Sequence, residues 1–259
     1  MQNDRLSLSR ENIRAYLGKR AASLHIRTFD SVDSTNTEAK RMALDGYEGQ
    51  VLIAANTQSA GRGRMGRSFY SPNHTGAYFS ILYRPEVSVD SAVTVTCATS
   101  VAVLRAIRRL TGRTCGIKWV NDLYLDSKKV CGILTECVSI GSDTHIIVGI
   151  GVNISTAFED TELSFVAGSL GADSLSSSEL IAEVVSELLP LLDDPGKREW
   201  LEDYRRYSLV IGKKISFVQN GESREGTVLS IDDDGALFVR LNDGEVLRLF
   251  SGEISLKMQ

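Results

Sequence analysis

The sequence predicts an α/β protein of the α+β kind, with a mixed β-sheet packed against helices and a small β-barrel at the C-terminal end. Up to residue 208, apolar strand-like runs are interspersed with stretches of helical periodicity. From residue 209 on, short alternating strands are separated by Asn220-Gly221, Asp234-Gly235 and Asp243-Gly244, dipeptides that favour tight hairpins. We therefore expect a large domain over residues 1–208 and a small domain over residues 209–259.

The individual elements follow from apolar periodicity and from residues that begin or end helices. Thr35 with Glu38, and Ser176 with Glu179, have the spacing of a capping box, and Gly46 is placed to end the first of these helices. Residues 126–128 have the composition of a turn between two strands. We expect helices at residues 10–19, 35–46, 90–110 (stopped by Gly112), 176–192 and 198–207, and strands at 25–32, 51–57, 77–84, 117–125, 129–138 and 145–154.

Composition excludes several classes of protein. The 42% hydrophobic and 24% charged content is that of an ordinary soluble globular chain, and the net charge of −4 provides no general attraction for nucleic acid. The polar N-terminus resembles neither a signal nor a transit peptide, and the longest apolar run, residues 145–154, is too short to span a bilayer. We expect a cytoplasmic protein that binds neither DNA nor membranes.

The cysteines and histidines show no metal-binding spacing. Cys97, Cys115, Cys131 and Cys137 form no C-x-x-C pair, so we expect buried thiols in a reducing compartment. The three histidines are scattered along the chain, which argues against a dedicated zinc site.

The stretch GRGRMGR, residues 61–67, is the most informative segment, and we name it the arginine loop. Its glycines allow a ligand to approach the backbone closely. Arg62, Arg64 and Arg67 concentrate positive charge that an anion would neutralise, and guanidinium groups match carboxylate and phosphate oxygens. The loop is therefore expected to bind an anion. The alternative, a solvated flexible basic loop, stays open on this segment alone.

The same glycines satisfy the G-x-G-x-x-G spacing of a dinucleotide-binding turn. That interpretation needs a strand before the glycines and a helix directly after them. A strand is expected before the loop, but residues 68–76 (SFYSPNHTG) are rich in turn formers and cannot begin a helix. We therefore exclude a Rossmann-type site.

Four further segments place polar residues or glycines beside apolar strands: residues 33–36 (DSTN), 118–122 (KWVND), 129–136 (KVCGILTE) and 149–153 (GIGVN). Ordinary helix capping is an alternative explanation for the first segment, and a turn is an alternative explanation for Asn121 and Asp122. Gly132, Gly149 and Gly151 would permit a ligand to touch the backbone. Together these segments provide cations, a carboxylate and glycine-lined walls, which suit the joining of a carboxylate to a phosphate.

The order STN, GRGRMGR, KWVND, KVCGILTE, GIGVN, SGEISLK resembles that of biotin protein ligases, from about residue 25 to residue 257. The resemblance implies a class II synthetase-like catalytic domain followed by a small SH3-like β-barrel. It also implies the monofunctional class, without the N-terminal DNA-binding domain of bifunctional members, and it allows a homodimer. The implied reaction activates biotin with ATP and Mg²⁺ to biotinyl-adenylate and transfers biotin to a lysine of a carboxylase biotin-carrier domain.

The resemblance also implies roles for individual residues. Arg64, Lys118, Asp122 and Lys129 would be catalytic, with Asp122 accepting or orienting the proton of the acceptor lysine. Biotin would contact Ser34, Thr35, Asn36, Gln58, Gly61, Arg62, Gly63, Arg64, Lys129 and Gly132. ATP would contact Arg64, Arg67, Phe69, Lys118, Lys129, Asn153 and Lys257.

The chain departs from the family pattern at Val120, where proline is usual, and at Phe69, where tryptophan is typical. Both changes bear on nucleotide affinity more than on activity, because the ring of Phe69 has less stacking area and no N–H donor. A lipoate or octanoate ligase or transferase, and a non-catalytic biotin-sensing module, are the alternative functions. The polar residues 34–36, Gln58 and Arg62 argue against an apolar fatty substrate, and Arg64, Lys118, Asp122 and Lys129 argue against an inactive protein.

Overall fold

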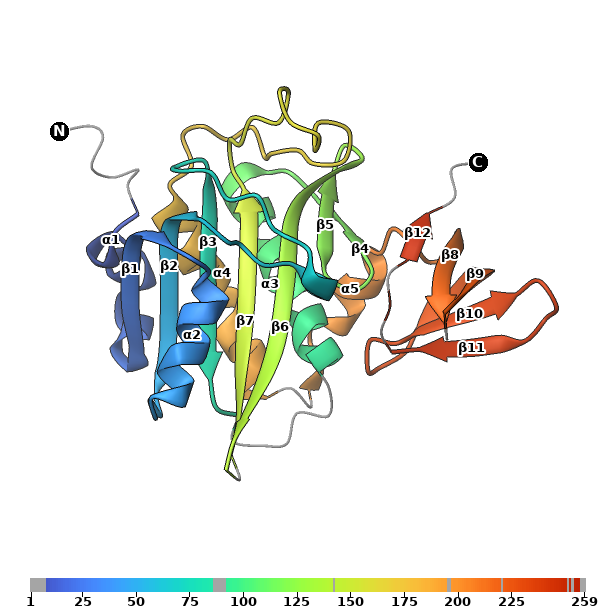
Figure 1. Ribbon diagram of the computed structural model, residues 1–259, viewed down its shortest axis with the longest axis horizontal. Helices are drawn as coiled ribbons and strands as arrows, with labels where there is room; N and C mark the ends of the chain where they lie inside the picture. Colours follow the sequence, from blue (N-terminus) through green and yellow to red (C-terminus); the bar gives the residue numbers. More distant parts are fainter. Residues whose placement is uncertain are drawn as a thin grey trace.

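The computed structural model describes residues 8–85, 92–141, 143–194, 197–219, 221–250, 252 and 254–256 (Figure 1). Its larger part is built on a seven-stranded mixed sheet in which only the first pair is parallel. In spatial order the strands are β1 (Leu24–Val32), β2 (Gln50–Gln58), β3 (Gly76–Tyr83), β7 (Asp143–Asn153), β6 (Lys128–Ile140), β5 (Asp122–Leu125) and β4 (Gly116–Lys118).

Helices cover the two faces of this sheet unequally (Figure 1). One face carries α1 (Arg10–Leu17), α3 (Ala92–Thr111) and α4 (Ser177–Asp193), whose apolar sides form the main core with the sheet. The other face carries α2 (Thr35–Leu44), which packs Ala39, Met42 and Ala43 on β2, β3 and β7. The arginine loop crosses this second face beside α2 and contains the short turn η2 (Arg64–Gly66). Polar loops and open sheet surface therefore meet next to the N-terminus of α2.

The C-terminal part is a separate five-stranded antiparallel sheet (Figure 1). Its strands, in spatial order, are β11 (Val246–Leu249), β10 (Leu237–Leu241), β9 (Glu222–Ile231), β8 (Lys214–Gln219) and β12 (Ile254–Leu256). It packs against the larger part near α3 and α5 (Leu201–Arg206), where buried Trp119 donates its Nε1 hydrogen bond to the Gly235 carbonyl over 2.8 Å. Gly235 has φ +85°, and a Cβ there would lie 2.7 Å from Cys97 Sγ, so only glycine fits this hairpin turn.

Within the described residues the expected strands and helices are confirmed, with the exception of one strand and with bounds that differ by up to three residues. The first residues of the helix expected at 90–110, and Asn220 of an expected hairpin turn, lie outside the described residues. Residues 117–125 form two short strands, β4 and β5, joined by a turn, instead of one continuous strand. Buried Trp119 and Val120 lie in this turn, so their apolar side chains pack in the core although their backbone is not part of a β-strand. The turn explanation for Asn121 is correct, while Asp122 already belongs to β5.

Neither helix begins with the side-chain hydrogen bond expected of a capping box, although Ser176 does occupy the predicted N-cap position of α4. Ser34, not Thr35, is the N-cap of α2, and Thr35 is the first helical residue. Ser176 is the N-cap of α4, but its hydroxyl makes no capping hydrogen bond. In α2 the hydroxyl of Thr35 instead donates to Gln58 Oε1, which ties the helix to the end of β2.

Three of the four cysteines are buried, as expected, whereas Cys137 is exposed near the far end of β6. Burial raises the pKa of the Cys97 and Cys115 thiols to about 12. Within the described residues, no helix combines the length and the apolar composition that crossing a membrane requires.

Candidate functional site

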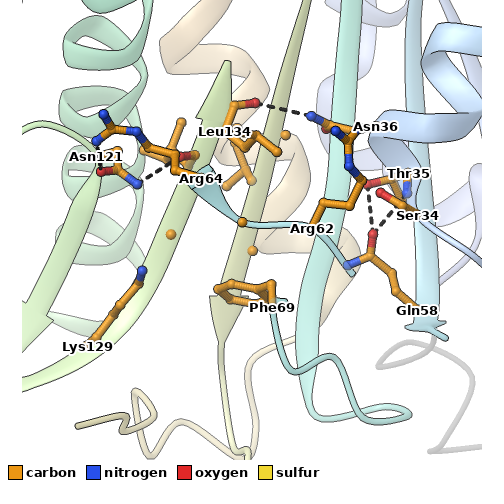
Figure 2. A pocket seen from close by; sticks show the side chains of 16 residues that line it. Ser34, Thr35, Asn36, Gln58, Arg62, Arg64, Phe69, Asn121, Lys129 and Leu134 are labelled. Atoms are coloured by element: carbon orange, nitrogen blue, oxygen red, sulfur yellow. Dashed lines mark hydrogen bonds between the residues drawn. The ribbon is translucent and has the colours of Figure 1, made fainter. Parts of the chain in front are cut away.

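Two adjoining cavities open on the face of the large sheet that carries α2. The first lies between the start of α2, the end of β2 and the glycines of β6 and β7 (Figure 2). The second lies between the arginine loop, the β4–β5 turn and the C-terminal sheet. Both cavities are lined by Gly63, Arg64, Phe69, Asn121 and Lys129, which form the wall between them.

The polar end of the first cavity is built where α2 begins and β2 ends. Gln58 Oε1 accepts hydrogen bonds from the backbone N–H of Thr35 at 2.9 Å and from its hydroxyl at 3.2 Å (Figure 2). Gln58 Nε2 donates to Ser71 Oγ at 2.8 Å. The hydroxyl of buried Ser34 makes no capping bond to α2. These groups form a neutral, internally bonded surface, with a hydroxyl beside it that can bind a ligand.

Asn36 uses both ends of its amide within the protein. Its Nδ2 donates to Glu136 Oε2 at 2.8 Å and to the Leu134 carbonyl at 3.3 Å, and its Oδ1 lies 2.6 Å from the hydroxyl of buried Ser80. A Cβ on Gly149 would lie 2.0 Å from Asn36 Oδ1. Gly149 therefore makes room for this side chain, and Asn36 holds α2 on the sheet.

The arginine loop is a small closed hairpin. Gly63 donates its N–H to the Arg67 carbonyl at 2.7 Å, and Phe69 donates to the Gly61 carbonyl at 2.8 Å. Met65 and Gly66 turn the chain at its tip with φ values of 54° and 76°. This folding differs from a Rossmann turn, because no helix follows the glycines and the next regular element is β3.

Arg62 and Arg64 of this loop bond to residues in other parts of the protein. Arg62 Nη1 donates to Glu136 Oε2 at 2.9 Å. Arg64 donates to Asn121 Oδ1 at 2.9 Å and to the Gly252 carbonyl at 3.2 Å, so the C-terminal part contributes directly to the site. Among the described residues these acceptors are neutral, and the charge of Arg64 is therefore available to an anion in either cavity.

The second cavity is rich in cations. Arg64, Arg67, Lys118 and Lys129 line it, and among the described lining residues the carboxylate is that of Asp122. Lys129 Nζ lies 2.7 Å from Asp122 Oδ1, a pair that the adjacent strands β5 and β6 bring together. Lys118 Nζ lies 5.6 Å from the centre of the Tyr124 ring. The excess of positive charge makes this cavity suitable for a polyanion such as a triphosphate.

Phe69 lies on the sheet at the junction of the two cavities (Figure 2). A Cβ on Gly151 would lie 2.4 Å from Phe69 Cε1, and one on Gly132 would lie 3.1 Å from Phe69 Cε2. We expected these glycines to let a ligand approach the backbone. In the structure, the space above them is taken by the ring of Phe69.

Cys131 adjoins the charged pair but is not a candidate nucleophile. Its thiol is buried and burial raises its pKa well above the usual range, although the charge of Lys129 opposes this shift. The thiol is therefore neutral at physiological pH. At the entrance to α2, the guanidinium of Arg41 lowers the pKa of Asp33, so that carboxylate is ionised and its 2.5 Å ion pair with Arg41 fixes the turn before Ser34.

Most of the predicted site residues come together. The first cavity is lined by Ser34, Thr35, Asn36, Gln58, Arg62, Gly63, Arg64, Phe69, Lys129 and Gly132, and the second by Arg64, Arg67, Phe69, Lys118, Asp122 and Lys129. Among the described residues, Gly61 and Asn153 line neither cavity. A Cβ on Gly61 would lie 2.4 Å from the Phe69 carbonyl, so this glycine serves the hairpin. Lys257 lies outside the described residues.

Asn153 is buried at the end of β7. Its Nδ2 donates to the Gly168 carbonyl at 2.9 Å, and its Oδ1 finds no donor within the described part of the chain. A buried acceptor without a partner is costly unless a ligand or a water supplies a donor. Asn153 therefore retains the capacity to accept a hydrogen bond, although it lines neither cavity.

Sequence reasoning gave no role to Asn121, Glu136 or Ser80, which orient the assigned residues. Asn121 and Glu136 stand within segments that interrupt apolar strands with polar residues, and this signal could have identified them. Ser80 stands in an otherwise apolar strand, β3, and its pairing with Thr35 and Asn36 depends on tertiary structure.

The described residues contain no group of three or more histidine, cysteine, aspartate or glutamate side chains that could hold a metal ion. Asp122 and Glu136, the carboxylates nearest the cavities, are paired with Lys129 and Arg62. These residues do not fit a dedicated Mg²⁺ site.

Comparisons with known proteins agree with this geometry. Residues 28–153 match the Biotin/lipoate A/B protein ligase family, and residues 210–257 match the Biotin protein ligase C terminal domain. The chain is 30% identical over 262 residues to the bifunctional ligase/repressor BirA of Bacillus subtilis (strain 168), covering 96% of this chain and 79% of the relative. It is 31% identical over 230 residues to the biotin–[acetyl-CoA-carboxylase] ligase of Paracoccus denitrificans, covering 80% of this chain and 91% of the relative.

A solved structure shares the architecture. The biotin protein ligase from Aquifex aeolicus, in complex with biotin and ATP, superposes with a TM-score of 0.77 at 25% identity, covering 91% of this chain and 99% of that chain. Because 91% of this chain is covered, the match extends beyond the large sheet into the C-terminal sheet. The chain therefore belongs to the biotin protein ligase family.

Proposed function

We propose that the protein condenses biotin with ATP to biotinyl-adenylate and then transfers the biotinyl group to a lysine of a carboxylase carrier domain. The observation that carries this proposal is the wall shared by the two cavities. Arg64 and Lys129 stand between the first cavity, whose polar end is a neutral hydrogen-bonding surface, and the cationic second cavity. The first cavity suits the ureido ring of biotin, whose N–H and C=O groups need partners when buried. The second suits the triphosphate.

In the first step, a carboxylate oxygen of biotin attacks the α-phosphorus of ATP and pyrophosphate leaves. The two reactants repel each other because both are anions. Arg64 and Lys129, which line both cavities, would lower this repulsion and stabilise the charge that develops on the α-phosphate. Arg67 and Lys118 would hold the phosphates. Mg²⁺ is expected to accompany the nucleotide rather than to occupy a site of the protein, and no step is assigned to it.

In the second step, the amine of the carrier lysine attacks the acyl carbon of the adenylate and AMP leaves. The amine must first lose a proton, and Asp122 is the carboxylate of the second cavity that can accept it. Asp122 and Lys129 are 2.7 Å apart, so the acceptor of the proton lies beside the cation assigned to the first step. Both steps therefore use one small region of β5 and β6.

The remaining assignments follow the two cavities. Ser34, Thr35, Gln58 and Arg62 would surround the ureido ring, and Phe69 would contact the adenine. A contact of Asn153 with the adenine is proposed from the family resemblance alone, because Asn153 lines neither cavity. We assign residues 1–208 to the catalytic domain and residues 209–259 to the C-terminal domain, whose Gly252 carbonyl holds Arg64. Because the reaction consumes ATP, we propose the cytosol as its compartment.

Pyrophosphate–ATP exchange, measured separately with biotin, lipoate and octanoate, tests this function. The hydroxyl of buried Ser34, which makes no capping bond, predicts exchange with biotin alone, since an aliphatic chain could not form a hydrogen bond with it. Exchange with lipoate or octanoate in place of biotin would identify the related acyl ligases instead. Biotin binding without exchange would identify a biotin-sensing module.

A further inference from the structure

Glu136 joins two parts of the biotin cavity that are far apart in the sequence. Its Oε2 accepts a hydrogen bond from Asn36 Nδ2 at 2.8 Å and one from Arg62 Nη1 at 2.9 Å. Asn36 belongs to the first turn of α2, and Arg62 belongs to the arginine loop. One carboxylate oxygen therefore connects the helix that presents Ser34 and Thr35 to the loop that crosses the cavity.

The strand alternation of β6 places Glu136 at this point. Leu134 and Gly132, two and four residues earlier, line the first cavity, so Glu136 faces the same side of the sheet. Thr135, on the opposite face, bonds instead to Thr96 of α3 at 2.8 Å. Glu136 itself does not line the cavity, and it can act on a ligand only through Asn36 and Arg62.

The carboxylate also determines how the Asn36 amide is oriented. Because a carboxylate only accepts hydrogen bonds, it requires the NH₂ group of Asn36 to face β6, which directs Oδ1 toward the hydroxyl of Ser80. Ser80 Oγ lies 2.7 Å from Thr35 Oγ1, and Thr35 bonds to Gln58. Close polar contacts thus link Glu136, through Asn36, Ser80 and Thr35, to the polar end of the cavity.

We infer that Glu136 is a positioning residue for biotin binding, acting through Arg62 on the loop and through Asn36 on the start of α2. This inference deepens the proposed function and depends on it. The Arg62 and Glu136 side chains are 44% and 24% exposed, and partly exposed ion pairs contribute little to folding stability. A purely structural role would therefore predict small effects, whereas positioning predicts a selective loss of biotin affinity.

Calorimetric titration of the full chain with biotin, paired with thermal unfolding, tests the inference with two substitutions. Glu136→Gln keeps the shape and can accept a hydrogen bond, but it removes the charge that pairs with Arg62. Glu136→Ala removes both contacts. We expect about a fivefold rise in the biotin Kd for Glu136→Gln and about a 50-fold rise for Glu136→Ala, since each tenfold corresponds to about one charge-assisted hydrogen bond.

The KM for ATP and the unfolding midpoint should change little in the same variants. Glu183→Gln is the matched control, because Glu183 has a similar exposed fraction and pairs with Arg109 on the helical face of the sheet. It should leave biotin affinity unchanged. Unchanged biotin affinity in both Glu136 variants, or equal losses for biotin and ATP together with a lower unfolding midpoint, would overturn the inference.

Arg62→Ala separates the two branches. In that background, Glu136→Gln should cost no further affinity, while Glu136→Ala should still weaken binding through Asn36. A full additional loss for Glu136→Gln would show that its effect does not pass through Arg62. If the wild-type chain bound no biotin, the proposed function itself would be overturned. That result is distinct from unchanged biotin affinity in the Glu136 variants, which would overturn only the inference about Glu136.

Discussion

The two cavities differ in how far the protein has already satisfied their polar groups. Around the first cavity, Asn36 and Gln58 bond within the protein, and Arg62 has Glu136 as a counter-ion. In the second cavity, four cations line the walls beside the carboxylate of Asp122. The first surface is oriented before a ligand arrives, whereas the second carries charge that a ligand would neutralise.

This difference matches the two ligands of the proposed reaction. A neutral ring is recognised by hydrogen bonds whose geometry must be set in advance, because each misplaced group loses affinity. A triphosphate is recognised mainly by charge, which tolerates less exact geometry and acts over a longer range. If one cavity recognises biotin and the other ATP, a substitution in either cavity should affect mainly one substrate.

Lys129→Ala should have the largest effect, because Lys129 lines both cavities. Loss of a charge that stabilises the transition state should lower pyrophosphate–ATP exchange by about 100- to 1,000-fold. The neighbouring Lys128 is exposed and lines neither of these cavities, so Lys128→Ala is the matched control and should retain exchange. Wild-type exchange in Lys129→Ala would remove the central feature of the mechanism.

Asp122→Asn should separate the two steps. The substitution keeps the size of the side chain but removes the proton acceptor, so transfer from preformed adenylate to a carrier domain should fall by about 100-fold. Adenylate formation, measured by pyrophosphate–ATP exchange, should fall much less. Equal losses in both steps would indicate that Asp122 acts mainly as the counter-ion of Lys129.

Thr35→Val and Lys118→Ala compare the cavities directly. The first removes one hydroxyl from the hydrogen-bonded surface and should raise the KM for biotin about tenfold with little change for ATP. The second removes a cation from the other cavity and should raise the KM for ATP about tenfold with little change for biotin. Steady-state kinetics with each substrate varied in turn measures both KM values. If Thr35→Val raised mainly the KM for ATP, or Lys118→Ala mainly the KM for biotin, the assignment of one substrate to each cavity would be refuted.

Acid pH should produce the smallest effect, on the attachment of the C-terminal sheet. Hydrogen bonds and charge from Arg198 and Arg248 lower the pKa of Asp234, which lies in the turn before β10. Its stabilising contribution is therefore complete above the ordinary Asp pKa of about 3.9 and is lost as the pH falls through the lowered value. Unfolding midpoints measured from pH 6 to pH 3 should fall less steeply in Asp234→Asn than in the wild type. Identical slopes would contradict this assignment.

The elements and the residue types of the site were accessible from the sequence because their signals are local. The dipeptides Asp234-Gly235 and Asp243-Gly244 predicted tight turns correctly, since positive φ restricts the choice of residue. The positive charge of the arginine loop follows directly from its three arginine residues. The same local reasoning failed at Thr35, whose hydroxyl bonds to a residue 23 positions away rather than to its own helix.

What the sequence determined by itself is thus the order of the elements and the chemical character of each segment, because backbone preference and apolar periodicity act between near neighbours. Tertiary structure alone decided which side chains meet. Glu136 and Asn36 are 100 residues apart, and Arg64 and Asn121 are 57 apart, yet both pairs form hydrogen bonds. These contacts depend on strand order and register, which result from burial of the whole sheet and which no single segment specifies.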